Sequence, residues 1–139
     1  MAEGPRVGGA QIQGRATLLV VDDEEMVRRL AARMLVTLGY RVVEAHDGNE
    51  AVRVLQRDAH RIDAVLTDIA MPGLNGKQLG ETVARCWPRV RVLYMSGFPA
   101  QRVMETGALD PTHPFMQKPF TEEQLGRKVR ELLAQPMEQ

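Results

Sequence analysis

Five short apolar runs alternate with five segments of helical periodicity, and this alternation constrains the fold more than any other feature of the chain. The first run, 17–21, is apolar on both strand faces, which is typical of a strand buried between two layers. In 27–38, apolar residues recur at steps of three and four, which predicts a helix with one buried face. The alternation predicts an α/β fold in which helices cover both faces of a parallel sheet. The expected strands are 17–21, 41–45, 64–67, 90–95 and 115–117, and the expected helices are 27–38, 49–57, 77–87, 99–106 and a last helix from Thr121.

Individual residues mark the ends of these elements. Gly39 follows the first helix at the place where a left-handed residue commonly stops one. Thr121 and Gln124 have the spacing of a capping box at the start of the last helix. Within the helices, we expect Met34 and Cys86 to face the core.

Composition limits the class of protein. The 139 residues suit a single domain, and 18 basic residues balance 18 acidic ones, so the formal net charge is zero. This balance argues against nucleic-acid binding through bulk positive charge, and no apolar run reaches the roughly 18 residues that span a bilayer. The lone Cys86 excludes a disulfide framework and a cysteine-rich zinc site, and without a signal-peptide pattern it favours a cytoplasmic location. We interpret 1–14 as a flexible leader and 136–139 as a tail.

Polar residues stand at the ends of four of the expected strands. Asp22 and Asp23 follow the first strand, Asp68 the third, Ser96 the fourth and Lys118 the fifth. The carboxyl ends of parallel strands share one edge of the sheet, so we expect these side chains to converge. Carboxylates about 4 Å apart repel by about 4 kcal/mol at an effective dielectric near 20, so positive charge must offset them. Lys118 supplies one charge, and Mg2+, a hard cation that takes oxygen ligands, is expected to supply more.

This arrangement suits transfer of a phosphoryl group to a carboxylate. An aspartate can act as a covalent nucleophile, and Asp68 on the central strand is the best-placed acid. The metal, the lysine, a hydroxyl and backbone N–H groups would stabilise charge on the transferring group. Each residue alone has a plainer interpretation: a helix cap for Asp22 and Asp23, a surface lysine for Lys118, and a turn for Ser96. Their joint occurrence at four strand ends favours the phosphoryl-transfer site.

Four segments at the strand ends also carry a family resemblance: VVDDE at 20–24, LTDIAMPGLNG at 66–76, YMSG at 94–97 and QKPF at 117–120. They resemble the receiver domain of two-component response regulators, over about Thr17 to Ala134. The resemblance implies a receiver (phosphoacceptor) domain at 15–135. Its fold would be flavodoxin-like (CheY-like), a doubly wound five-stranded parallel sheet of order 2-1-3-4-5 with five helices.

The resemblance assigns the acceptor and the metal ligands. Asp68 would accept the phosphoryl group of a phosphohistidine. Asp23 and Asp68 would bind Mg2+ directly, together with the backbone carbonyl of Ala70. Asp22 would take part mainly through water.

The resemblance also assigns the groups that bind the phosphoryl oxygens and the switch. The expected phosphoryl-binding residues are Ser96, Lys118, Ile69, Ala70 and Gly97. Phosphorylation adds roughly −1.5 to −2 charge, and the switch residues Ser96 and Phe115 are expected to move in response. The Lys118–Pro119 peptide bond is expected to be cis.

The implied partner is a sensor histidine kinase or its phosphohistidine domain, followed by a downstream phosphotransfer or effector protein. We expect no direct contact with nucleic acid or membrane. A homodimer through the fourth helix, fifth strand and fifth helix is a further expectation. A narrower resemblance to the C-terminal receiver of hybrid sensor histidine kinases predicts a receiver that is either excised from such a kinase or free-standing. The chain would be a phosphoacceptor and not an enzyme with turnover.

Three residues depart from the usual family pattern. Ala70 and Phe98, each two residues after a site residue, lack polar side chains that could orient an attacking water. We therefore expect slow self-dephosphorylation. Phe115 replaces the commoner tyrosine, so no hydroxyl is available in the inward position of the switch.

Three other functions compete with this interpretation. A phosphatase of the haloacid dehalogenase type also forms an aspartyl phosphate, but it needs a second aspartate where Ala70 stands. A flavodoxin-like binder of flavin or another small molecule would share the fold. A degenerate receiver that only binds proteins is disfavoured by the complete set of Asp, Ser and Lys residues.

Overall fold

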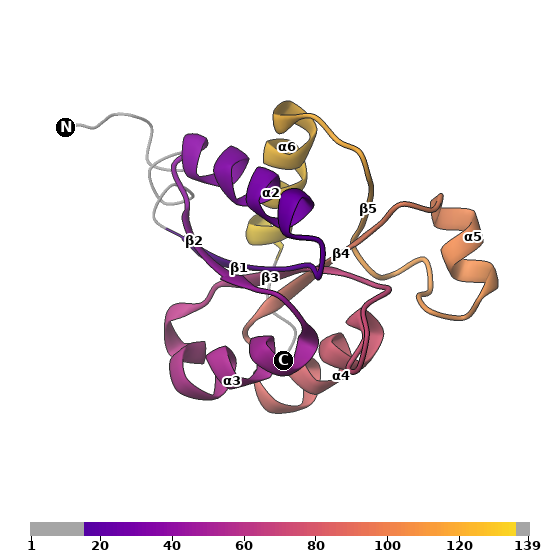
Figure 1. The fold of residues 1–139 in the computed structure, drawn as a ribbon, viewed down its shortest axis with the longest axis horizontal. Coiled ribbons are helices and arrows are strands. Elements are labelled where there is room, and N and C mark those ends of the chain that lie inside the picture. The colour runs from indigo at the N-terminus through magenta and orange to yellow at the C-terminus, as the bar shows by residue number, and fades with distance from the viewer. Residues whose placement is uncertain (1–15, 136–139) are drawn as a thin grey trace.

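The computed structural model describes residues 16–135, so the leader predicted at 1–14 and the tail predicted at 136–139 lie outside the described residues. Five parallel strands form one sheet in the order β2-β1-β3-β4-β5 and alternate with five α-helices, which confirms the predicted fold (Figure 1). The strands are β1 (Thr17–Val21), β2 (Arg41–Ala45), β3 (Ala64–Asp68), β4 (Arg91–Ser96) and β5 (Phe115–Gln117). The helices are α2 (Glu25–Thr37), α3 (Gly48–Asp58), α4 (Gly76–Cys86), α5 (Ala100–Glu105) and α6 (Glu122–Ala134), with a short 3-10 helix, η1 (Ala59–Arg61), that the sequence pattern did not predict.

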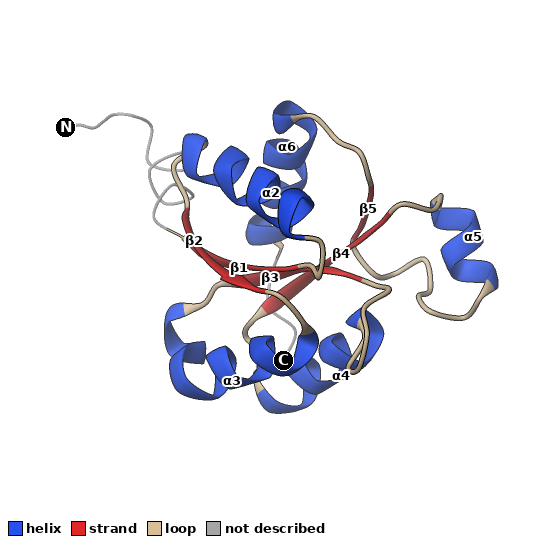
Figure 2. Cartoon of the chain, in the orientation of Figure 1, coloured by secondary structure: helices blue, strands red, loops and turns tan. Residues whose placement is uncertain are grey.

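The sheet separates two hydrophobic cores. Helices α2 and α6 cover one face, α3 and α4 cover the other, and α5 lies apart at the β5 edge (Figure 2). Strand β1 contributes to both cores, because Leu18 and Val20 pack with α2 and α6, whereas Leu19 and Val21 pack with α3 and α4. All four side chains are fully buried, as the continuous apolar run predicted.

Local sequence signals define the helix ends. Gly39 adopts a φ of 103° after α2, the left-handed conformation that glycine reaches without steric cost. The capping box of Thr121 and Gln124 is present at α6, and a second one, formed by Asn75 and Gln78, starts α4. Within residues 16–135, no helix is both long and apolar enough to cross a bilayer.

Two helical residues, Cys86 and Leu30, are more exposed than the helical periodicity predicts. Cys86 is exposed, so its predicted core position is wrong: α4 ends at this residue, and Trp87 after it packs against the core instead. Met34 packs against the core as predicted. Leu30, in the expected apolar stripe of α2, is 54% exposed because it faces a groove at the sheet edge and not the sheet itself.

Candidate functional site

Three carboxylates meet where β1 and β3 end. Asp22 and Asp23 follow β1, and Asp68 is the last residue of β3. One carboxylate oxygen of each lies within 4.8 Å of the others. Asp22 is fully buried and Asp68 is nearly so, whereas Asp23 is exposed. The convergence follows from the parallel pairing of β1 with β3, which brings their carboxyl ends to one edge.

Lys118 joins two of these acids. Its Nζ lies 3.1 Å from Asp22 Oδ2 and 3.1 Å from Asp68 Oδ1. The backbone around it continues the sheet, because the Lys118 N–H donates to the Ser96 carbonyl at 2.8 Å, and the Lys118–Pro119 peptide bond is cis. The lysine side chain is only 15% exposed, so this charge is directed into the cluster and not into solvent.

The cluster is short of positive charge. Three carboxylates carry −3 and Lys118 carries +1, which leaves −2. Burial raises the pKa of Asp68, and the neighbouring Lys118 ammonium offsets this only in part. Burial alone would lower the pKa of Lys118, but the Asp68 and Asp22 carboxylates outweigh it and raise the pKa above its usual range. Oxygen donors with a residual −2 charge fit a divalent hard cation such as Mg2+.

Asp22 is held through its backbone as well as its carboxylate. Its N–H donates to the Ala45 carbonyl at 3.2 Å, and its Oδ1 accepts from the Glu24 N–H at 3.0 Å. Its backbone carbonyl accepts from Arg28 Nη1 at 3.1 Å. The sequence analysis did not single out Arg28. No local pattern could have found it, since its partners lie on β2 and at the end of β1.

The loop after Asp68 is fixed by α4. The Gly76 N–H donates to the Ile69 carbonyl at 2.8 Å, and a Cβ on Gly76 would lie 2.3 Å from the Asp68 carbonyl oxygen. Only glycine allows the helix to start this close to the end of β3. The Ile69 N–H donates to the Met95 carbonyl at 3.0 Å, so it must share or leave that bond to bind an anion.

A groove of about 570 Å³ opens over Asp68. The site residues that line it are Asp68, Ala70, Ser96, Gly97 and Lys118. Ser96 Oγ accepts from the Phe98 N–H at 3.0 Å, so the hydroxyl oxygen faces its own loop. Apolar side chains form the far wall: Val27, Leu30, Met34, Phe98 and Phe120. The groove therefore joins a charged floor to an apolar wall.

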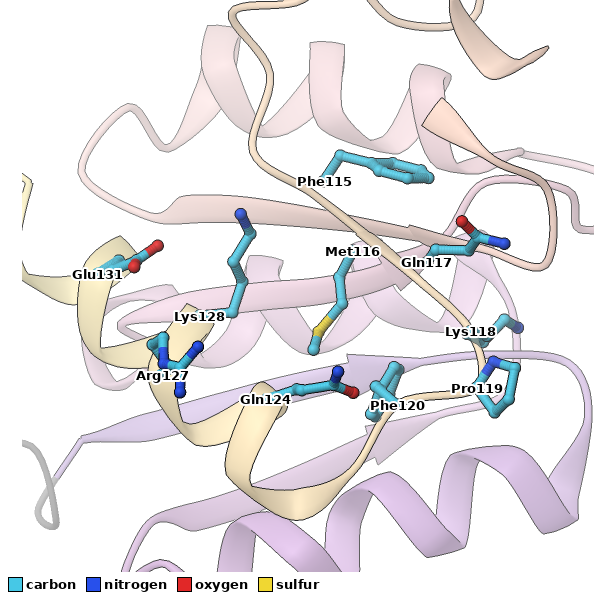
Figure 3. A pocket seen from close by; sticks show the side chains of 10 residues that line it. All are labelled: Phe115, Met116, Gln117, Lys118, Pro119, Phe120, Gln124, Arg127, Lys128 and Glu131. Atoms are coloured by element: carbon cyan, nitrogen blue, oxygen red, sulfur yellow. The ribbon is translucent and has the colours of Figure 1, made fainter. Parts of the chain in front are cut away.

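Phe115 lies outside this groove. It is partly buried against the small cluster of Tyr94, Val103 and Leu109 near α5, whereas Met116 packs on the α6 side. Figure 3 shows the two side chains on opposite sides of β5. A separate hollow of about 590 Å³ is lined by β5, the segment after it and α6 (Figure 3).

Comparison with known proteins agrees with this geometry. A family model described as the response regulator receiver domain matches residues 18–130. The sensor kinase CckA of Brucella abortus is 32% identical over 122 residues, which are 88% of this chain and 13% of that kinase. The response regulator MprA of Mycobacterium ulcerans is 32% identical over 116 residues, which are 84% of this chain and 49% of that regulator. The chain thus spans less than half of either relative.

Solved structures match over most of their length. The receiver domain of the hybrid histidine kinase CckA has a TM-score of 0.70 at 34% identity, covering 85% of this chain and 99% of that one. The chemotaxis protein CheY4 of Vibrio cholerae has a TM-score of 0.75 at 25% identity, covering 85% of this chain and 98% of that one. Together with the matched family model, these similarities show that the chain belongs to the response regulator receiver domain family of two-component signalling systems.

Proposed function

We propose that Asp68 receives a phosphoryl group from a phosphohistidine on a histidine kinase or phosphotransfer domain, with Mg2+ bound at the acid cluster. The observation that carries the proposal is the position of Lys118 Nζ, 3.1 Å from both Asp22 and Asp68, in a cluster of three acids. Asp23, Asp68 and the Ala70 carbonyl would hold the ion. Both carboxylate oxygens of Asp22 already accept hydrogen bonds, which suits a contribution through water.

Asp68, Lys118 and Ser96 would have different roles in phosphoryl transfer. An Asp68 carboxylate oxygen would bond to phosphorus as the P–N bond of the donor breaks, and the imidazole would leave with the electron pair and take up a proton. The raised pKa of Lys118, caused by Asp68 and Asp22 against the effect of burial, keeps it a cation that can bind phosphoryl oxygens. Ser96 would donate its hydroxyl proton to another oxygen. When bound, Mg2+ would neutralise charge on the transferring group.

The reaction would leave the phosphoryl group on the chain itself, as in a switch. Ala70 is exposed and lines the groove, where a haloacid dehalogenase-type phosphatase would need an acid. Phosphorylation would move Ser96 and Phe115 and alter the surface of α5, β5 and α6, where an effector or a second copy would bind. The hollow in Figure 3 belongs to this surface.

The rim of the groove favours a protein as the phosphoryl donor. Met26, Leu30 and Phe98 are 86%, 54% and 53% exposed, and the last two line the groove over Asp68. Exposed apolar side chains beside a charged floor fit a protein surface better than a small hydrophilic anion. We therefore propose that the rim formed by Leu30 and Phe98 contacts the protein that carries the phosphohistidine.

The test is phosphorylation by acetyl phosphate, read by intact mass with and without Mg2+. We expect the native protein to gain one phosphoryl group only with Mg2+, and Asp68→Asn to gain none. The control is Asp47→Asn, because Asp47 caps α3 by accepting from the Glu50 N–H and asparagine caps equally well. An unmodified native protein, or equal labelling of the Asp68 variant, would refute the proposal.

A further inference from the structure

Arg28 connects the acid cluster to β2. Its Nε donates to Glu44 Oε1 at 2.9 Å, and its Nη1 donates to the Asp22 backbone carbonyl at 3.1 Å. The side chain is 13% exposed, although it lies on the second turn of a surface helix. We infer that Arg28 is a positioning residue for the metal site, which holds the turn after β1 so that Asp22 and Asp23 face Asp68. This inference rests on the proposed function.

The Asp22 carbonyl, which accepts a hydrogen bond from Arg28, sets the direction of the backbone that leads into Asp23. The Asp22 carbonyl belongs to the planar peptide that leads into Asp23, so fixing its direction fixes where the next residue begins. Asp22 has three other anchors, whereas Asp23 is exposed and depends on its backbone for position. Arg28 therefore acts most strongly on the orientation of the Asp23 carboxylate, one of the two carboxylates proposed to bind the metal directly.

Arginine suits this place because its guanidinium is planar. Two N–H donors in a fixed fork reach a side-chain acceptor on β2 and a backbone acceptor after β1 at the same time. A lysine carries the same charge on one flexible donor centre and does not reproduce the fork. The Arg28→Lys variant therefore separates geometry from charge.

Loss of the Arg28 charge and loss of its positioning contact are expected to change the Mg2+ affinity in opposite directions. A cation beside a magnesium site repels the ion, so removing the charge alone should tighten Mg2+ binding. Loss of a positioning contact should weaken binding, and outer-shell substitutions commonly cost about tenfold or more in metal affinity. Arg29 is the matched control, because it is 65% exposed, its charge pair is Glu25 on the same helix at 3.4 Å, and it stands one residue away.

The experiment is calorimetric titration of Mg2+ into the full chain without phosphodonor, for the native protein, Arg28→Lys, Arg28→Gln and Arg29→Gln. We expect both Arg28 variants to bind Mg2+ about tenfold more weakly and Arg29→Gln to bind at least as tightly as the native protein. With acetyl phosphate, the Mg2+ concentration for half-maximal labelling should rise by the same factor, while the rate at saturating Mg2+ stays near native.

The outcomes separate this inference from the proposed function. A native protein that binds no Mg2+ would overturn the proposed function itself. Native binding with an unchanged affinity in Arg28→Lys, or tighter binding in Arg28→Gln, would overturn the positioning role. Equal weakening in Arg29→Gln would do the same, because it would make the effect one of helix charge. Thermal unfolding without Mg2+ confirms that each variant is folded.

Discussion

The excess negative charge around Asp68 predicts that Asp68→Asn stabilises the metal-free protein. At an effective dielectric near 20, a carboxylate at the 4.8 Å limit that spans the cluster repels the Asp68 carboxylate by about 3.5 kcal/mol, and Lys118 at 3.1 Å attracts it by about 5 kcal/mol. Two repelling acids therefore outweigh one lysine by about 2 kcal/mol. Solvent screening of the exposed Asp23 reduces this difference to about 1 kcal/mol, or roughly 4 °C in Tm for a domain of this size.

The difference in stability between Asp68→Asn and the native protein depends on pH and on bound Mg2+. The folded-state pKa of Asp68 is raised, chiefly by burial, so ionisation disfavours the folded state above that pKa. The advantage of Asp68→Asn should be absent below the ordinary pKa range of an aspartate, grow as the pH rises through that range, and be complete once the pH exceeds the raised folded-state pKa. At ten times the dissociation constant, Mg2+ should stabilise the native protein by about 1.4 kcal/mol and the variant by much less. The order of stabilities should therefore reverse with Mg2+.

The assay is urea unfolding of both proteins at neutral and acidic pH, with chelator or with Mg2+. Glu123→Gln is the control, because it removes a carboxylate that is 84% exposed and paired only loosely, at 3.9 Å, with Arg127. Its stability should be unaffected by Mg2+ and lie slightly below that of the native protein, because a first-turn helix carboxylate contributes about 0.3–1 kcal/mol; this change is opposite in sign to that of Asp68→Asn. A metal-free Asp68→Asn that is less stable than the native protein at neutral pH would refute the electrostatic reasoning.

Three further predictions concern residues around the groove. Native aspartyl phosphate should persist well beyond a few seconds in Mg2+, and Ala70→Asn should shorten its lifetime; rapid loss from the native protein, followed by intact mass, contradicts this. Gly76→Ala should lower the free energy of unfolding by about 3 kcal/mol, because its Cβ would lie 2.3 Å from the Asp68 carbonyl oxygen. Urea unfolding measures this loss, and Gly97→Ala is the control: its Cβ would have nothing within 4 Å, so it should change the free energy of unfolding little. Leu30→Gln should slow labelling by a phosphohistidine protein and leave labelling by acetyl phosphate unchanged; equal slowing of both would show that Leu30 acts on the acceptor and not on docking.

The sequence alone was enough for the order of elements and for the floor of the site. Continuous burial of β1 follows from an unbroken apolar run, and helix starts follow from side chains such as Thr121 that bond to nearby backbone. The pattern of strands also assigns Asp22, Asp68 and Lys118 to one cluster, because parallel strands place their carboxyl ends at one edge whatever their exact register. These conclusions need only local periodicity and the geometry of the sheet.

The tertiary structure decided what depends on contacts between distant elements. Arg28 acquires its partners only because β2 lies beside β1 in the observed register, which sets Glu44 opposite Val20. Leu30 is exposed because the groove interrupts the packing of α2, and the Ile69 N–H is engaged because Asp68 pairs with Met95, whose carbonyl accepts from the residue after Asp68. Side-chain pattern describes one element at a time, whereas each of these features is set by the distance between two elements.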